Sequence, residues 1–215
     1  MRWQNNIFLP PMPKEVSFDG VIGLTGGIAC GKTLISDYMA SYGVDVIDGD
    51  LISRRLYRPG SELLAEIADA FGAEVLFADG NLNRRLMREI VFADEDARYR
   101  LNRIVQPAIR HAITTDLFHS KKDHQFLVVP LLIEGGYIDL CDEVWVVFVR
   151  EEIQMERLMA RDGIDGELAR AMIDSQMPYA VKKKYADRVI DNNGTPRDTY
   201  RQLRKSFLKF LKKNY

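Results

Sequence analysis

The sequence has few cysteines, and this limits the classes of protein it can belong to. Only Cys30 and Cys141 occur among 215 residues, and their spacing is neither that of a disulfide framework nor that of a zinc site. Two free thiols fit a reducing compartment. We therefore expect a cytoplasmic protein without structural disulfides or zinc.

Long apolar runs and an excess of one charge are also lacking. The run "FLVVPLLI" is interrupted by Pro130 and is far shorter than the ~18 residues of a membrane span. Residues 1–19 contain three prolines and no apolar core of a signal peptide, so we interpret them as an extension before the fold. With 30 basic and 31 acidic residues, the net charge of -1 argues against a protein that coats nucleic acid. We expect small-molecule partners, no membrane or nucleic-acid partner, and a monomer or weak homo-oligomer.

What the sequence does contain is an alternation of apolar strands and amphipathic helices. Strands are predicted at residues 20–25, 44–48, 125–134, 142–149 and 188–192. Helices are predicted at residues 32–42, 61–72, 82–92, 94–118, 151–162 and 195–213. Strands that are apolar throughout are typical of a parallel sheet with helices on both faces, so the predicted fold class is a three-layer α/β sandwich. Two strand-poor segments, 52–100 and 158–186, are predicted to lie beyond the carboxyl ends of the strands, where ligands bind in such sheets.

Residues 26–33, "GGIACGKT", match the pattern G-x-x-x-x-G-K-S/T between a predicted strand and a predicted helix. A loop with few side chains can curl its backbone N–H groups around phosphate oxygens, and the helix N-terminus adds the positive end of its dipole. A lysine at this place reaches the β and γ phosphates, and the hydroxyl of Thr33 is a ligand for Mg²⁺. The sequence therefore predicts a nucleotide-binding loop, with these candidate residues: Gly27, Ala29, Cys30, Gly31, Lys32, Thr33 and Leu34.

Two aspartates follow the second predicted strand, in "VIDGDLISRR". Asp48 and Asp50 would serve Mg²⁺ and a substrate hydroxyl, because phosphoryl transfer needs a cation and a positioned acceptor; alternatively they are solvated turn residues. Arg54 lies one helical turn after Asp50 and either holds a substrate phosphate or pairs with that aspartate. The local sequence leaves these alternatives open.

The polar segment near residues 153–186 carries Arg157 and Arg161 one helical turn apart, followed by three lysines at 182–184. Such charge runs are usually solvated surface. A mobile flap that brings arginine to phosphates would, in contrast, exclude water from a transfer site, as a kinase requires.

Seven segments together resemble the dephospho-coenzyme A kinases, which phosphorylate the ribose 3'-hydroxyl of dephospho-coenzyme A in the last step of coenzyme A biosynthesis. They are "GLTGGIACGKT", "VIDGDLISR", "GNLNRRLMREIVF", "LNRIVQPAIR", "VVPLLIE", "RLMARDG" and "ADRVIDNNG", in the order of that family. The resemblance runs from about residue 21 to 194. It implies a P-loop kinase core, a helical subdomain for the coenzyme A precursor, a lid, and the use of ATP and Mg²⁺.

The resemblance also implies boundaries and roles. The kinase domain would span 20–215, with its core at 20–50, 101–152 and 187–215, the substrate subdomain at 51–100 and the lid at 153–186. The implied catalytic residues are Asp50 as proton acceptor, Lys32 and Arg161. Implied ATP contacts outside the loop are Arg157 and Asn193, and implied substrate contacts are Asp48, Arg54, Arg84 and Lys182.

Three departures from the family pattern stand out. Ala29 and Cys30 replace the usual glycine and serine of the phosphate loop, and Gln106 replaces a histidine. Alanine leaves its backbone N–H free, so phosphate binding is expected to survive. A thiol near a helix N-terminus and Lys32 is expected to have a lowered pKa and to react with iodoacetamide.

Other P-loop proteins fit the sequence less well. A switch GTPase would carry an Asn-Lys-x-Asp segment, and no asparagine in this chain precedes a lysine. A motor ATPase would end an apolar strand in adjacent acidic residues, whereas "VVPLLIE" ends in the single Glu134. A kinase for another small acceptor shares the loop and lid, and only the segments around Asp50 and residues 82–92 argue against it. A non-enzymatic relative would be expected to lose Lys32 or Asp50.

Overall fold

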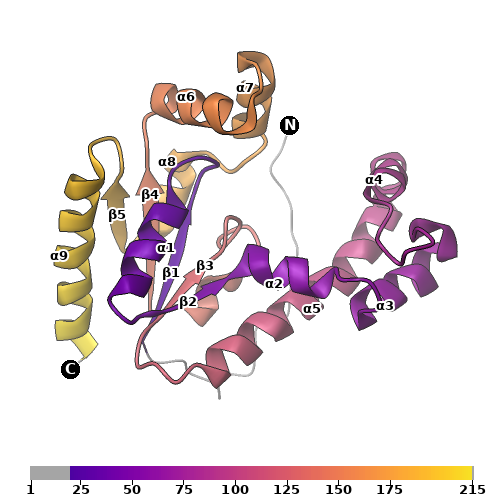
Figure 1. Ribbon diagram of the computed structural model, residues 1–215, viewed down its shortest axis with the longest axis horizontal. Coiled ribbons are helices and arrows are strands. Elements are labelled where there is room, and N and C mark those ends of the chain that lie inside the picture. Colours follow the sequence, from indigo (N-terminus) through magenta and orange to yellow (C-terminus); the bar gives the residue numbers. More distant parts are fainter. Residues whose placement is uncertain (1–19, 215) are drawn as a thin grey trace. The chain divides into compact units, whose positions relative to one another are not determined.

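The computed structural model describes residues 20–214, and the extension predicted at 1–19 lies outside them (Figure 1). Within the described part, contacts divide the chain into two compact units. The first comprises residues 20–47 and 119–214, and the second comprises residues 48–118.

The first unit is built on a sheet whose strands are β1 (Val21–Gly26), β2 (Asp45–Asp48), β3 (Gln125–Val128), β4 (Glu143–Phe148) and β5 (Arg188–Asp191). The strand order is β2-β3-β1-β4-β5, and β1 pairs in parallel with β3 and β4, as does β4 with β5. Because parallel strands end at one edge of a sheet, the segments that follow β1, β3, β4 and β5 meet there. This edge carries the phosphate loop.

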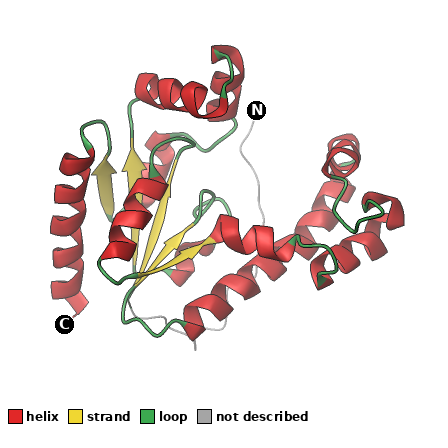
Figure 2. Cartoon of the chain, viewed as in Figure 1, coloured by secondary structure: helices red, strands yellow, loops and turns green. Residues whose placement is uncertain are grey.

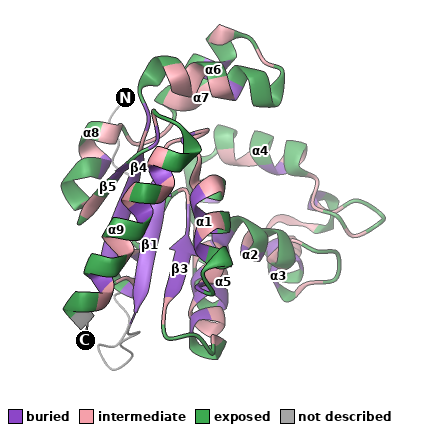
Figure 3. Cartoon of the chain, turned by 60° about the vertical axis from the view of Figure 1, so that its left-hand side comes forward, coloured by how far each residue is buried: buried purple, intermediate pink, exposed green. Residues whose placement is uncertain are grey.

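The strands β1, β3 and β4 are buried along almost their whole length (Figure 3). On one face, alternate strand residues pack against α1 (Lys32–Ser41) and α9 (Pro196–Asn214). On the other face, a Cβ atom at Gly23 would lie 2.6 Å from the Cys141 Sγ and 2.8 Å from a Leu132 methyl, so only glycine fits. The predicted α/β class with a parallel sheet is confirmed.

The polar segment after β4 folds into short helices, which Figure 2 shows in red: α6 (Glu151–Asp162), α7 (Gly166–Asp174) and α8 (Tyr179–Lys182). Gly163 ends α6 in the left-handed conformation, with φ 65°, and Asp165 caps α7 by accepting a 2.8 Å hydrogen bond from the Leu168 N–H. The helix predicted at 151–162 has these bounds. Helices α7 and α8 were not predicted, because segments of nine and four residues give too little periodicity to recognise. We call residues 153–186 the lid segment.

The second unit is helical and contains α2 (Gly49–Leu56), α3 (Glu62–Phe71), α4 (Arg84–Ala93) and most of α5 (Glu95–His119). A 3₁₀ turn, Ala73–Val75, separates α3 from α4. The side chains of Ser61 and Asn83 cap α3 and α4, as serine and asparagine do before an apolar helical run. The unit has its own core, formed by Leu63, Leu64, Ile67, Val75, Met87 and Val105.

The contacts group all of residues 48–118, whereas the sequence placed the substrate subdomain at 51–100 and returned to the core at 101. The assignment of this unit to the binding of substrate stays a prediction.

The strand predicted at 125–134 is shorter in the structure and ends at Val128. Pro130 has no N–H for a sheet ladder, and the Gly135 N–H turns back to the Leu131 carbonyl at 2.7 Å.

Among residues 20–214, no helix combines the length and the apolar character that crossing a membrane requires.

Candidate active site

The loop between β1 and α1 has the backbone of an anion-binding nest. Ala29 and Gly31 have φ values of 55° and 92°, in the left-handed region that orients neighbouring N–H groups toward one side. Helix α1 then begins at Lys32, and no side chain caps its first turn. Its unpaired N–H groups are therefore available to an anion. Ala29 is the one described residue other than glycine with a positive φ, so the loop holds it against its preference.

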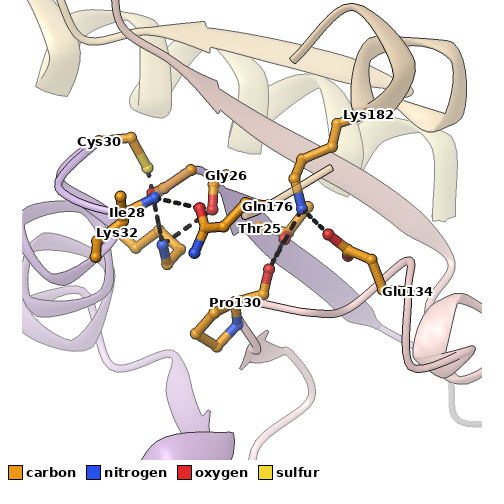
Figure 4. A network of polar contacts seen from close by, with 10 residues as sticks. Thr25, Gly26, Ile28, Cys30, Lys32, Pro130, Glu134, Gln176 and Lys182 are labelled. Carbon is orange, nitrogen blue, oxygen red and sulfur yellow. Dashed lines mark hydrogen bonds and ion pairs between the residues drawn. The ribbon is translucent and has the colours of Figure 1, made fainter. Parts of the chain in front are cut away.

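Lys32 folds back over its own loop in this structure. Its Nζ donates to the carbonyl oxygens of Gly26 and Gly27, at 3.0 Å each, and lies 3.9 Å from the Cys30 Sγ (Figure 4). The ammonium is thus held within the loop, ready to exchange carbonyl oxygens for phosphate oxygens. The next residue, Thr33, is exposed.

Cys30 differs from the sequence-based expectation. Its side chain is 2% exposed and packs beneath the loop, where a Cβ on Gly26 would lie 2.7 Å from the sulfur. Burial raises the pKa of the Cys30 thiol, and the nearby Lys32 cation only partly opposes this. The predicted lowering of the pKa was wrong, because the loss of solvation outweighs the charge and dipole on which the prediction relied.

The segment after β5 supports the loop from beneath. Asn192 is 2% exposed, donates from Nδ2 to the Cys30 carbonyl at 2.8 Å, and accepts at Oδ1 from the Thr199 hydroxyl at 2.8 Å. A Cβ on Gly31 would lie 2.2 Å from the same Nδ2, which is why glycine stands there. The next residue, Asn193, is the one for which the family resemblance implied an ATP contact. That side chain accepts from the Arg150 N–H at 2.7 Å and so joins the ends of β4 and β5.

The two lid arginines lie in different surroundings. Arg157 donates to the Asn192 carbonyl at 3.1 Å and therefore lies beside the phosphate loop, and its contact with ATP stays a prediction. Arg161 instead forms a two-pronged pair with Asp162, at 2.7 and 2.8 Å, and its side chain is 55% exposed. The structure does not bring Arg161 to the loop.

Two lid glutamines reach the loop, although no sequence motif pointed to them. Gln154 of α6 donates to the Ile28 carbonyl at 2.7 Å, and Gln176, between α7 and α8, accepts from the Ile28 N–H at 2.7 Å. Glutamine is common on polar surfaces, so its presence in a charged segment gave no signal.

Lys182, which was predicted to contact substrate, lies in a buried ion pair in this structure. It is 1% exposed, and its Nζ lies 2.5 Å from the Glu134 Oε1 and 3.5 Å from the Pro130 carbonyl (Figure 4). The same carbonyl accepts from the Thr25 hydroxyl at 3.0 Å. The lysine therefore ties the lid segment to the residues that follow β3, and a contact with substrate would first have to break a buried ion pair.

In the helical unit, Asp48 caps α2 by accepting from the N–H groups of Asp50 and Leu51, at 2.8 and 3.2 Å. Both hydrogen bonds go to one carboxylate oxygen, Oδ1, of the residue that was predicted to contact substrate. Asp50 in the first turn of α2 and Arg54 one turn later are both exposed. Arg84 lies over the ring of Tyr57, with 5.1 Å from the guanidinium carbon to the ring centre.

Comparison with known proteins places this arrangement in a family. The chain matches the family model described as dephospho-CoA kinase over residues 20–198. A protein of Shouchella clausii named Dephospho-CoA kinase is 42% identical, and the match covers 85% of this chain and 94% of that protein. Among solved structures, TT1252 from Thermus thermophilus is 29% identical with a TM-score of 0.77, covering 90% of this chain and 98% of that one. A dephospho-CoA kinase from Campylobacter jejuni is also 29% identical, with a TM-score of 0.66 and coverage of 91% and 98%.

The matched residues include the nest-shaped loop, its lysine, the segment after β5 and most of the lid segment. The chain therefore belongs to the dephospho-CoA kinase family of P-loop kinases, which catalyses the last step of coenzyme A biosynthesis by ATP-dependent phosphorylation of dephospho-CoA.

Proposed function

We propose that this chain transfers the γ-phosphoryl group of ATP to the ribose 3'-hydroxyl of dephospho-coenzyme A, and that its phosphate loop holds the triphosphate. The observation that carries the proposal is the loop itself. Left-handed turns at Ala29 and Gly31 lead into the uncapped first turn of α1, which supplies several N–H donors and a partial positive charge to one anion. Leu34, in the first turn of α1, contributes its N–H to the same set.

Thr33 fits the role of the protein ligand for Mg²⁺. Within residues 20–214 no group of three or more His, Cys, Asp or Glu side chains is arranged to hold a metal ion. That matches the habit of Mg²⁺ in kinases, where one or two protein oxygens share the ion with phosphates and water. When bound, Mg²⁺ supplies positive charge to the β and γ oxygens. The exposed hydroxyl of Thr33, next to Lys32, is the oxygen that the loop offers.

The cationic side chains then stabilise the negative charge of the transferred group. Lys32 would leave the carbonyls of Gly26 and Gly27 for phosphate oxygens, and Arg157 would reach the nucleotide from its place on the Asn192 carbonyl. Arg161 would have to exchange Asp162 for phosphate. Arg161 would therefore contact phosphate in a conformation of the lid segment that differs from the one in this structure.

The acceptor side of the reaction belongs to the helical unit. Asp50 would accept the proton of the 3'-hydroxyl as that oxygen attacks the γ-phosphorus, and the bond from phosphorus to the β–γ bridging oxygen would break. Arg54, on the same exposed face of α2, and Arg84 would bind the phosphates of the acceptor. Asp48 would act by setting the first turn of α2, on which Asp50 stands.

We further propose that the enzyme is cytoplasmic, acts as a monomer or weak homo-oligomer, and needs no partner besides its two small substrates. These statements rest on the balanced charge and the small number of cysteines in the chain.

A coupled kinase assay tests the proposal. The purified protein is given ATP and Mg²⁺ with dephospho-coenzyme A, adenosine, AMP or shikimate, and formation of ADP is followed. We expect turnover with dephospho-coenzyme A to exceed that with the other acceptors, and activity to stop when EDTA removes Mg²⁺ and to return with added Mg²⁺. Faster turnover of another acceptor would refute the substrate while leaving the fold assignment intact.

A further inference from the structure

Both main-chain polar groups of one phosphate-loop residue, Ile28, are bound by the lid segment. The Ile28 N–H donates to the Gln176 Oε1, and the Ile28 carbonyl accepts from the Gln154 Nε2, each at 2.7 Å. The two glutamines are 22 positions apart and come from different parts of the lid segment. Figure 4 shows Gln176 reaching the loop beside Lys32.

Gly27 explains how Gln154 gains access. A Cβ atom on Gly27 would lie 2.6 Å from the Gln154 Nε2, a separation that real side chains do not adopt. Yet the pattern G-x-x-x-x-G-K-S/T leaves this position free, since only the first and sixth residues must be glycine. The glycine at 27 is thus accounted for by the lid segment rather than by phosphate.

The bonds matter because they fix the backbone on both sides of the Ile28 Cα. The Ile28 N–H belongs to the peptide that joins Gly27 to Ile28, and the Ile28 carbonyl belongs to the peptide that joins Ile28 to Ala29. Ala29 is held in the left-handed region, and its N–H belongs to the set that faces an anion. A change in φ or ψ at Ile28 would rotate these two peptides and turn that N–H away. Two side chains that each bind one of the two peptides resist that rotation.

We propose that Gln154 and Gln176 are positioning residues that hold the two peptides flanking the Ile28 Cα, and with them the nucleotide-binding N–H groups, in the orientation that ATP requires. The inference rests on the proposed use of the loop for ATP. A different interpretation makes Gln176 a placeholder that occupies an N–H until a phosphate oxygen displaces it. We favour positioning, because Gln154 binds the carbonyl of the same residue, and a phosphate cannot donate to that carbonyl in its place.

The first experiment measures kinetics of Gln154→Leu, Gln176→Leu and the double variant. Each lost hydrogen bond should raise the KM for ATP about 5- to 10-fold, with kcat within about 3-fold and the KM for dephospho-coenzyme A unchanged. Because both side chains hold the backbone of one residue, the double variant should show less than the product of the single effects. A lower KM for ATP in Gln176→Leu would overturn positioning in favour of the placeholder.

The second experiment follows amide hydrogen exchange at Ile28 without nucleotide, and so does not depend on the proposed function. Gln176→Leu should lose the protection of the Ile28 N–H, whereas Gln176→Glu keeps an acceptor oxygen and should retain most of it. At position 154 the carboxylate of Gln154→Glu would face the Ile28 carbonyl without a donor, so this change should be as harmful as leucine. Unchanged exchange in Gln176→Leu would refute the inference even if the enzyme phosphorylates dephospho-coenzyme A as proposed.

Gln202→Leu is a matched control. Gln202 binds the N–H and the carbonyl of Asp191 on β5, at 3.1 and 2.9 Å, and so holds the backbone of one residue in the same way without touching the loop. We expect it to lower the melting temperature but to leave exchange at Ile28 unchanged. A loss of Ile28 protection in this control as large as in Gln176→Leu would show that general loosening is responsible and would overturn the proposal.

Discussion

At the scale of single residues, Lys32 and Asp50 are the side chains whose proposed roles differ most. Lys32 is held by the carbonyls of Gly26 and Gly27, so its charge is already at the loop before a reaction begins. Asp50 is exposed on the first turn of α2, and its backbone N–H is bound by Asp48. In the proposed mechanism Lys32 acts on phosphates in all states, and Asp50 acts only when the acceptor loses its proton.

We therefore predict that Asp50→Asn lowers kcat by about 10²–10⁴-fold, the usual contribution of a positioned general base, with little change in ATP affinity. Lys32→Ala should lower both the rate and ATP affinity, because its charge is felt in the ground state and in the transition state. Steady-state kinetics and calorimetric ATP binding measure the two effects separately. Near-normal turnover by Asp50→Asn would leave that residue no role as proton acceptor.

Cys30 shows how burial reverses a residue-scale expectation. Burial raises the pKa of its thiol, and burial also raises the pKa of Cys141, where nearby aspartates add to the effect. A raised pKa leaves less thiolate, and a buried sulfur is also hard for a reagent to reach.

The prediction is slow alkylation. In the native protein near pH 7.5, Cys30 should react with iodoacetamide more slowly than in urea, because its raised pKa leaves less thiolate and its burial hinders the reagent. Mass spectrometry of the alkylated peptides gives the rate at each cysteine, and Cys30→Ser confirms the assignment of the peptide. Native reaction at the rate of the unfolded chain would contradict the burial.

At the scale of elements, the buried ion pair of Lys182 and Glu134 joins α8 to the turn after β3. The side chain of Lys182 is 2% exposed and that of Glu134 is 16% exposed, so neither charge is well solvated. The second oxygen of the carboxylate, Oε2, is buried and forms no hydrogen bond. Because few other groups stabilise either charge, removal of one partner would leave the other charge buried without compensation.

We predict that Glu134→Leu or Lys182→Met alone lowers the free energy of unfolding by about 3–5 kcal/mol, because one charge stays buried without a partner. The double variant should recover much of this loss, since no unpaired charge remains. Urea unfolding of the three variants measures it. Lys183→Met, at an exposed neighbour, is the control and should change stability by no more than about 0.5 kcal/mol. A loss below about 1 kcal/mol in both single variants would contradict the account.

At the scale of the whole molecule, the parallel sheet brings distant segments to one edge. The phosphate loop follows β1, Glu134 lies after β3, α6 follows β4, and Asn192 follows β5. Each of these segments donates to or accepts from another, as in the bonds of Asn192 to Cys30 and of Lys182 to Glu134. The helical unit, residues 48–118, has a separate core and carries the side chains proposed for the acceptor.

Much of this was readable from the sequence by itself. The apolar runs predicted all five strands, although the strand predicted at 125–134 ends earlier, at Val128. The pattern at residues 26–33 identified the phosphate loop. These features are local: a strand reveals its burial by its composition, and the loop needs particular residues at consecutive positions. The order of the motifs also indicated the family that the comparisons show.

Only the tertiary structure decided which side chains that are far apart in the sequence bind one another. Gln154 and Gln176 bind Ile28, and Lys182 pairs with Glu134, across separations of up to 148 positions. The burial of Cys30 depends on the residues that cover its side chain. A residue type fixes which bonds a side chain can form, but solvation and packing fix which it does form, and these are properties of the folded chain.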